Sequence, residues 1–154
     1  MQCFTNISFR QANFTEETSL TDLAFRSKSF WGYSEAFMKS CKQELTLTSE
    51  YLKRSVHLVA ERKGELVGFA ALSGVHTKQD WELDFLFIEP KFIGLGLGKL
   101  LWEKIIRRAK NLGIKRLILA SDPGAESFYL KMGAKRIGQR KSLARYIPLL
   151  EFHL

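Results

Sequence analysis

The residues that most clearly suggest a ligand-binding site are three alternating glycines. They lie in the run Ile93, Gly94, Leu95, Gly96, Leu97, Gly98 and Lys99. An apolar stretch precedes this run and a helical pattern follows it, which predicts a turn between a strand and a helix. Because glycine has no Cβ atom, such a turn can aim backbone N–H groups at a ligand beside the positive end of the helix. The run therefore predicts a phosphate or pyrophosphate site. Its glycine spacing differs from that of a P-loop and of the dinucleotide-binding fingerprint.

Two carboxylates, Glu82 and Asp84, stand in the stretch before the glycines. Alternate residues of a strand share a face, so both are expected to point the same way as Leu86 and Ile88 unless a bulge intervenes. The other face would carry Trp81, Leu83, Phe85 and Phe87. Paired acids among apolar neighbours raise the pKa of at least one carboxyl group, which suits a general base. The alternative is a pair of exposed or ion-paired acids at the end of a sheet.

Tyr129 lies in a helical pattern of apolar residues with Ala125, Phe128 and Met132. This spacing alone predicts a tyrosine in the core.

An aromatic cluster, Phe30, Trp31 and Tyr33, stands between two predicted helices and is followed by Glu35. Aromatic faces and a nearby acid suit the binding of a cationic amine. A hydrophobic staple between the two helices explains the cluster equally well.

Three segments of the chain resemble, in the same order, motifs of the GNAT superfamily of N-acetyltransferases. The glycine run is similar to the family's pyrophosphate loop, Arg/Gln-x-x-Gly-x-Gly/Ala, where Gly96 and Gly98 match and Ile93 replaces the first residue. Residues 122–134 look like the family helix Asn-x-x-Ala-x-x-Phe-Tyr-x-x-x-Gly-Phe, with Asp122 for Asn and Ala134 for Phe. Residues 82–90 are similar to the strand that precedes the loop and often carries an acidic catalytic residue.

The resemblance implies a single-domain α/β fold over residues 1–154, with a mixed, mostly antiparallel sheet flanked by helices. It also implies transfer of an acetyl group from acetyl-CoA to a primary amine of a small molecule or peptide, by direct attack in a ternary complex. A catalytically silent module that binds or senses acyl-CoA is the alternative. A homodimer is compatible with the family, and no motif specifies the acceptor.

The resemblance also assigns expected roles to individual residues. Glu82 is the expected general base with Asp84 as the next candidate, and Tyr129 is expected to protonate the leaving CoA sulfur. A backbone N–H of Leu86, Phe87 or Ile88 would stabilise the oxyanion. The acceptor would be held by Phe30, Trp31, Tyr33 and Glu35. The other residues expected to contact acetyl-CoA are Ile93, Gly94, Leu95, Gly96, Leu97, Gly98, Lys99, Asp122, Ala125, Phe128, Tyr129 and Lys131.

The composition is that of an ordinary globular domain. The 154 residues are 45% hydrophobic and 26% charged, and this length predicts one domain. Lys and Arg number 24 against 16 Asp and Glu, which gives a net charge of +8. A solvated basic surface, part of which attracts the phosphates of CoA, explains this excess better than nucleic-acid binding. Nucleic-acid binding is the third hypothesis and predicts a steep salt dependence.

Other classes of protein find little support. No apolar stretch approaches the roughly 20 residues of a membrane span, and the first residues lack a secretion or import signal, so the cytoplasm is the expected location. Cys3 and Cys41 have no ligand-like spacing, so no metal site is expected. The three histidines, His57, His76 and His153, are scattered outside the motifs and are not expected to be catalytic.

Hydrophobic periodicity predicts strands that alternate with helices along much of the chain. Thr15 and Asp122 are expected N-caps, and Gly113 is expected to end the longest helix. The buried face of that helix would be Leu101, Ile105, Ala109 and Leu112. The predicted strands span residues 7–10, 57–62, 66–73, 81–88, 116–120, 135–139 and 147–153. The predicted helices span about 15–28, 34–42, 98–112 and 123–132.

Overall fold

A seven-stranded sheet with the strand order β1-β2-β3-β4-β5-β7-β6 is the framework of the protein. The computed structural model describes residues 6–74 and 79–154. The described strand pairs are antiparallel except for β4 and β5, which are parallel. The strands are β1 (Ile7–Arg10), β2 (Val56–Arg62), β3 (Glu65–Ser73), β4 (Asp80–Ile88), β5 (Arg116–Ala120), β6 (Lys135–Ser142) and β7 (Arg145–His153).

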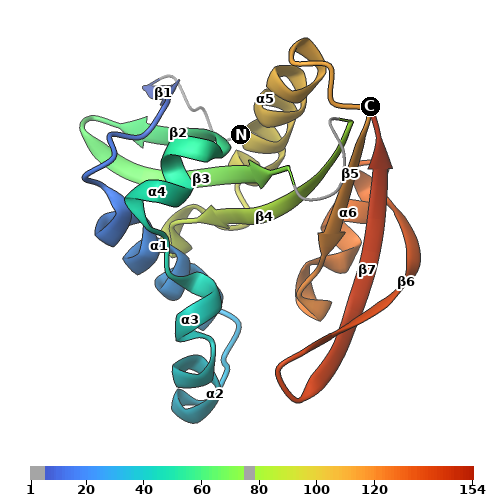
Figure 1. Cartoon of the computed structure of the whole chain (residues 1–154). Helices are drawn as coiled ribbons and strands as arrows, with labels where there is room; N and C mark the ends of the chain where they lie inside the picture. Colours follow the sequence, from blue (N-terminus) through green and yellow to red (C-terminus); the bar gives the residue numbers. More distant parts are fainter. Residues whose placement is uncertain (1–5, 75–78) are drawn as a thin grey trace.

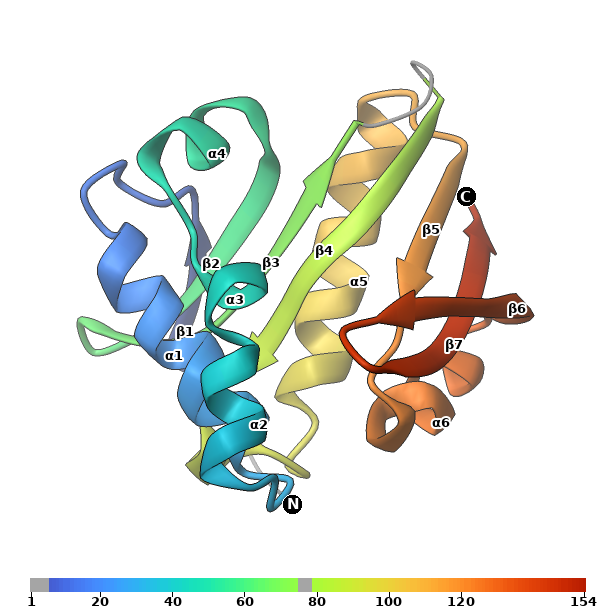
Figure 2. The ribbon, with the colours of Figure 1, turned by 60° about the horizontal axis from the view of Figure 1, so that its bottom comes forward.

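Helices cover both faces of this sheet (Figures 1 and 2). On one face, Leu23 of α1 and Leu52 of α4 are buried with Phe69 of β3. On the other face, Leu101 of α5 is buried with Leu72 of β3. None of the described helices is long and apolar enough to cross a membrane. The helices are α1 (Glu17–Ser29), α2 (Glu35–Ser40), α3 (Lys42–Leu45), α4 (Ser49–Arg54), α5 (Leu97–Asn111) and α6 (Glu126–Lys131), with 3₁₀ turns η1 (Pro90–Phe92) and η2 (Pro123–Ala125).

The predicted fold class is confirmed, and the predicted strands are all present with small shifts at their ends. Gly113 follows the end of α5 with φ +83, a conformation in which a side chain would be strained. Asp122 is a cap, but of the 3₁₀ turn η2, where its carboxylate accepts from the Gly124 N–H. The short helices α3 and α4 were not predicted as separate elements.

Two helix predictions are wrong. Thr15 does not cap α1, because the N-cap position belongs to Glu16, whose carboxylate makes no cap hydrogen bond and instead pairs with Arg10. Leu112 does not belong to the buried face of α5, because the helix ends at Asn111 and the Leu112 side chain is 58% exposed.

Strands β4 and β5 diverge after a short paired region (Figure 2). Their pairing joins Asp80 to Arg116 at one end and Glu82 to Ile118 at the other. Beyond Glu82, no described strand pairs with β4 on that side, although β3 continues to pair with β4 as far as Ile88. One backbone edge of β4 therefore faces a gap in the middle of the sheet.

A bulge at Asp84 overturns the predicted alternation along β4. Ala71 and Leu72, which are consecutive in β3, pair with Phe85 and Leu83, so Asp84 is an extra residue in β4. Because an extra residue reverses the alternation, the prediction that Leu83 and Phe85 share a face is wrong. The side chains packed on the α5 side are Trp81, Leu83, Leu86 and Ile88, and those packed on the α1 side are Phe85 and Phe87.

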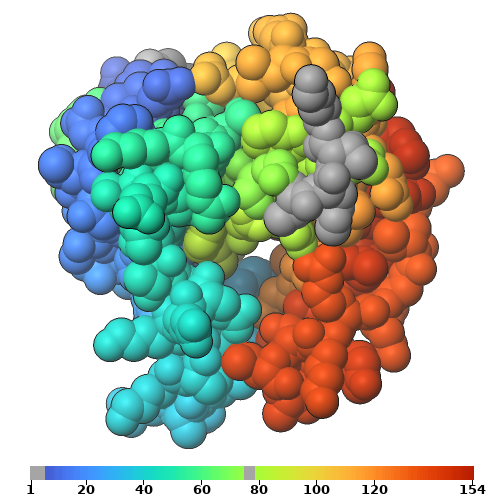
Figure 3. All heavy atoms as spheres, viewed as in Figure 1, coloured from blue at the N-terminus to red at the C-terminus, as the bar shows by residue number. Residues whose placement is uncertain are grey.

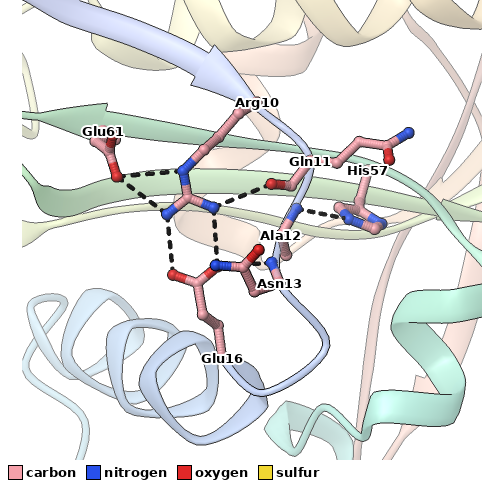
Figure 4. A network of polar contacts seen from close by, with 7 residues as sticks. All are labelled: Arg10, Gln11, Ala12, Asn13, Glu16, His57 and Glu61. Carbon is pink, nitrogen blue, oxygen red and sulfur yellow. Dashed lines mark hydrogen bonds and ion pairs between the residues drawn. The ribbon is translucent and has the colours of Figure 1, made fainter.

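Polar contacts fix β1 and the start of α1 to β2 (Figure 4). The Arg10 guanidinium donates to both carboxylate oxygens of Glu16 at 2.9 and 3.0 Å and to Glu61 at 3.0 Å. Nearby, buried His57 accepts the Ala12 N–H at Nε2 over 3.0 Å. A histidine that accepts at Nε2 is uncharged, and its Nδ1 lies 2.9 Å from the Ser55 hydroxyl.

His57 is expected to make the protein less stable in acid. Burial, and then the nearby Arg108 charge, lower the pKa of His57 below its usual value, so the folded state binds fewer protons than the unfolded state. Stability should therefore fall as the pH drops below the unfolded-state pKa of about 6.5. Thermal melts between pH 7 and 5 should show a shallower loss of Tm for His57→Gln than for the wild type. Equal slopes would contradict the assignment, and His153→Gln, at an exposed site, is the control.

Candidate active site

A cavity of about 1010 Å³ lies at the open end of the gap between β4 and β5. Its walls include β4, the glycine run, α6 and the β6–β7 hairpin. Figure 3 shows the hollow between the helices α2 to α4 on one side and this hairpin on the other. Figure 2 shows that α5 begins behind it, between the end of β4 and α6. The cavity thus connects the glycine run at the back of the sheet with the opposite, front face.

The glycine run has the backbone geometry of an anion site. Gly94 and Gly96 have φ values of +83 and +94, so both positions favour glycine. Gly96 is the N-cap of the 15-residue helix α5. Five N–H groups have no acceptor among the described residues, and they belong to Gly94, Gly96, Leu97, Gly98 and Lys99. Unpaired N–H groups at a helix start, beside the positive end of its dipole, bind phosphate oxygens.

Most of the residues predicted to bind the cofactor line the cavity. Leu95 and Leu97 do not, because the Leu95 side chain is exposed and Leu97 is fully buried in the core. Gly98 leaves space between two lining residues: a Cβ atom there would lie 3.5 Å from the Phe128 ring and 3.9 Å from Ile88. The lining members of the predicted set are Leu86, Phe87, Ile88, Ile93, Gly94, Gly96, Gly98, Lys99, Asp122, Ala125, Phe128, Tyr129 and Lys131.

The free edge of β4 offers one backbone N–H in particular to the gap. The Glu89 N–H donates to Val67 of β3 at 2.8 Å, and amides along an antiparallel strand point alternately toward and away from the partner. The N–H groups of Ile88 and Leu86 therefore point away from β3. That of Ile88 donates to the buried Ser27 hydroxyl at 3.3 Å. Of the three predicted oxyanion donors, Leu86 is thus the one whose N–H is directed into the gap.

Asp84 is a carboxylate with raised proton affinity. The Tyr51 hydroxyl of α4 donates to its Oδ2 at 2.6 Å. Solvent reaches Asp84 through the cavity, but protein surrounds its carboxyl group on most sides, and this desolvation raises the pKa of Asp84. Hydrogen bonds from Ser73 and Tyr51 lower the pKa in part, and the neighbouring Glu82 charge raises it further. The bulge thus places the extra residue of β4 where its carboxylate can accept a proton.

Glu82 lines the same cavity, but its carboxylate forms an ion pair with Arg140 of β6. The two residues are 58 positions apart in the sequence. This pair matches the second interpretation of the acids, as ion-paired groups at a sheet end, and occupies one Glu82 oxygen.

Tyr129 lines the cavity, and its ring belongs to the core. The ring packs edge-on against Trp102 of α5, with centroids 5.8 Å apart. Burial raises the pKa of Tyr129, so the hydroxyl remains protonated at neutral pH. It has no hydrogen-bond partner among residues 6–74 and 79–154, although Tyr129 lines the cavity. The hydroxyl is therefore free to donate to a ligand.

The predicted aromatic cluster is divided by the fold. Trp31 lines the cavity, whereas Phe30, Tyr33 and Glu35 do not. The Tyr33 hydroxyl instead donates to Asp122 at 2.6 Å, and Arg145 lies 3.5 Å from the same carboxylate oxygen. The Arg145 guanidinium also lies over the Tyr33 ring, 5.3 Å from its centroid. A cation of the protein itself thus occupies an aromatic face that was expected to bind an amine.

Sequence reasoning missed several lining residues, among them Ser27, Tyr51, Arg54 and Arg140. None lies in a recognisable motif, and only the fold brings them to β4. The histidines and cysteines predicted to have no chemical role include Cys3 and His76, which lie outside the described residues. Among the residues that are described, no cluster of three His, Cys, Asp or Glu has the arrangement of a metal site.

The sequence pattern of the acetyltransferase (GNAT) family matches residues 19–134. The chain belongs to this family. Its relatives include an uncharacterized N-acetyltransferase, ycf52-like, of Prochlorococcus marinus, which is 34% identical over 102 residues. The match covers 66% of this chain and 55% of the relative, so this chain spans about half of that protein's length. The peptidyl-lysine N-acetyltransferase YjaB of Salmonella typhimurium is 35% identical over 107 residues, which are 68% of each chain.

Solved structures of GNAT proteins share the fold. The PaiA N-acetyltransferase of Thermoplasma acidophilum, in complex with coenzyme A, superposes with a TM-score of 0.79 at 21% identity, over 96% of this chain and 99% of that one. A GNAT acetyltransferase of Elizabethkingia anophelis with acetyl-CoA bound has a TM-score of 0.72 at 19% identity, over 97% and 99%. The predicted membership of the GNAT superfamily is confirmed.

Proposed function

We propose that this GNAT protein transfers an acetyl group from acetyl-CoA to a primary amine by direct attack in a ternary complex. The gap between β4 and β5 carries the proposal, because it connects the glycine run at the back of the sheet with the carboxylates Glu82 and Asp84 at the front. A cofactor held at the glycine run can reach the gap with its thioester, and an amine can enter from the opposite side. The two substrates would meet beside Leu86.

In this mechanism each group acts at a different point of the transfer. The N–H groups of the glycine run hold the pyrophosphate of acetyl-CoA, and Lys99 adds the positive charge that Ile93 lacks. Asp84 accepts the proton of the amine, since its pKa is raised and the Glu82 carboxylate is paired with Arg140. The amine nitrogen then attacks the thioester carbon, and the Leu86 N–H stabilises the negative oxygen. The C–S bond breaks, the nitrogen loses its second proton to the leaving thiolate, and the Tyr129 hydroxyl donates a hydrogen bond to that sulfur.

The direct test is release of free CoA thiol from acetyl-CoA in the presence of a panel of primary amines, with the acetylated product identified by mass. Amine-dependent release that yields the N-acetyl product would support the proposal. Tight binding of acetyl-CoA without turnover on any amine would favour the alternative, a silent acyl-CoA-binding module.

Gly98→Val is expected to raise the Kd for acetyl-CoA about tenfold or more, which corresponds to about 1.4 kcal/mol. A Cβ at Gly98 makes only ordinary contacts, so the helix should form. The two methyl groups of valine, however, would enter the space between Phe128 and Ile88. Calorimetric titration gives the Kd, and Gly138→Val is a matched control because nothing lies within 4 Å of a Cβ there. Wild-type affinity in a folded Gly98→Val protein would rule out this cofactor position.

A further inference from the structure

The side chains that line the cavity carry a net positive charge. Seven basic and four acidic residues line it. Lys99 lies in the first turn of α5 and Lys131 ends α6, so both belong to the cofactor end. The basic residues are Lys28, Arg54, Lys99, Lys131, Arg140, Lys141 and Arg145, and the acidic residues are Glu44, Glu82, Asp84 and Asp122.

Two of the four acids are already neutralised within the protein. Glu82 is paired with Arg140, and Asp122 lies 3.5 Å from Arg145. Asp84 accepts the Tyr51 hydroxyl. A second ammonium group on an acceptor would therefore find few carboxylates without a partner at this opening. Two aromatic rings near this opening already hold a cation of the protein, because Arg145 lies 4.7 Å from the Phe37 centroid and 5.3 Å from that of Tyr33.

One wall of the cavity is basic along a continuous segment. Residues 127–150 contain six Lys or Arg and no Asp or Glu. This segment forms most of α6, all of β6 and the start of β7, which together make the side of the hollow opposite α2 to α4 (Figure 3). Lys141 on β6 lines the cavity and forms no ion pair with a described carboxylate.

Arg54 supplies a positive charge from the opposite wall. It ends α4, and its guanidinium lies 5.0 Å above the centroid of the Tyr51 ring. The hydroxyl of the same ring holds Asp84. One aromatic side chain thus fixes both the carboxylate proposed as the base and the guanidinium beside it. Within the described chain Arg54 has no carboxylate within ion-pairing distance.

From this arrangement we infer that the acceptor is a small amine that carries an anionic group, a carboxylate or a phosphate, close to its nitrogen. The inference rests on the proposed function. When the amine nitrogen of the acceptor reaches Asp84, the anionic group of the acceptor is attracted by two cations. These are Arg54 on one wall of the cavity and Lys141 on the other. A guanidinium binds either anion through two parallel hydrogen bonds. An acceptor with a second positive charge is repelled by the same two residues.

The test compares acceptors that differ in this group alone. The panel contains α-amino acids, their carboxamides, aminoethyl phosphate and a diaminoalkane, at saturating acetyl-CoA, with rates expressed per free amine. The kcat/KM of the best amino acid should exceed that of its carboxamide about tenfold or more. The ranking of carboxylate against phosphate identifies the anion. A diaminoalkane or a carboxamide as the best acceptor would overturn the inference.

Variants separate this binding role from a structural one. Arg54→Gln should bring the ratio of acid to carboxamide toward one while the KM for acetyl-CoA and the Tm stay unchanged. Arg107→Gln, on the exposed face of α5 away from the cavity, is the control. An equal loss on all acceptors in Arg54→Gln would contradict anion binding.

The anion site can be tested separately from the proposed acetyl transfer. If no amine is acetylated, calorimetric titration of the CoA complex with the amino acids and with aminoethyl phosphate decides the question. Binding that Arg54→Gln abolishes would support the anion site, and absence of binding would overturn it.

Discussion

Replacement of Asp84 with Asn is expected to lower kcat/KM for the acceptor amine by about 10²–10⁴ near neutral pH. An ammonium ion cannot attack a thioester, so loss of the base leaves only the small fraction of free amine. Asn keeps the shape of the side chain and an oxygen that can accept from the Tyr51 hydroxyl, so the fold should be retained. Because free amine accumulates in alkali, the defect should shrink as the pH rises.

The pH dependence of the rate tests whether Asp84 is the base. The wild-type rate should rise with pH through the raised pKa of Asp84, because only the deprotonated carboxylate accepts the proton. The Asn variant should lack this rise and follow the titration of the amine alone. Thermal melts of both proteins exclude misfolding.

Glu82→Gln is the matched comparison, because Glu82 lines the same cavity but is paired with Arg140. Its expected loss in kcat/KM is smaller, about tenfold or less, since the Glu82 carboxylate is held by Arg140 and is not the proposed proton acceptor. A larger loss in Glu82→Gln than in Asp84→Asn would identify Glu82 as the base, in agreement with the family pattern. Unchanged profiles in both variants would place the base elsewhere.

The fold and the turn at the glycine run could be predicted because their signals are local. The turn at Gly94 and Gly96 depends on the backbone freedom of those residues, and the helix that follows shows its own periodicity. The strand edge that holds Leu86 was also identified, although only the register with β3 distinguishes its N–H from that of Phe87, and only the contact with Ser27 distinguishes it from that of Ile88. Apart from the Ser27 contact, these interactions join residues near each other in the sequence or in adjacent strands.

The front of the site could not be predicted, because its contacts are long-range. Tyr51 reaches Asp84 over 33 positions and Arg140 reaches Glu82 over 58. Both contacts depend on where a six-residue helix and a hairpin come to lie. The bulge at Asp84 could not be predicted either. The side chains of β4 alternate between faces both before and after the extra residue, so the sequence does not show where the alternation is interrupted. These features changed the expected base and the expected charge of the acceptor.

Replacement of Tyr129 with Phe is expected to lower kcat by about 10–10², less than loss of the base. The smaller loss is expected because the Tyr129 hydroxyl has a higher pKa than the thiol of CoA. Burial raises the pKa of Tyr129 above its usual value of about 10, whereas a thiol has a pKa of about 8.5. Full transfer of the Tyr129 proton to the leaving thiolate is therefore uphill. The hydroxyl should stabilise the thiolate by a hydrogen bond to a charged group, which contributes about 1.5–3 kcal/mol.

A hydrogen bond from Tyr129 to the leaving sulfur can be tested by changing the thiol of the thioester. The phenylalanine ring keeps the packing against Trp102, so the Tm and the Kd for acetyl-CoA should stay close to wild type. With a thioester of a more acidic thiol the sulfur carries less charge to stabilise, so the difference between Tyr129 and Phe should shrink. Single-turnover rates with both thioesters, measured across pH, give the comparison. A defect of equal size with both thioesters would mean that the hydroxyl acts on the amine or the carbonyl rather than on the sulfur.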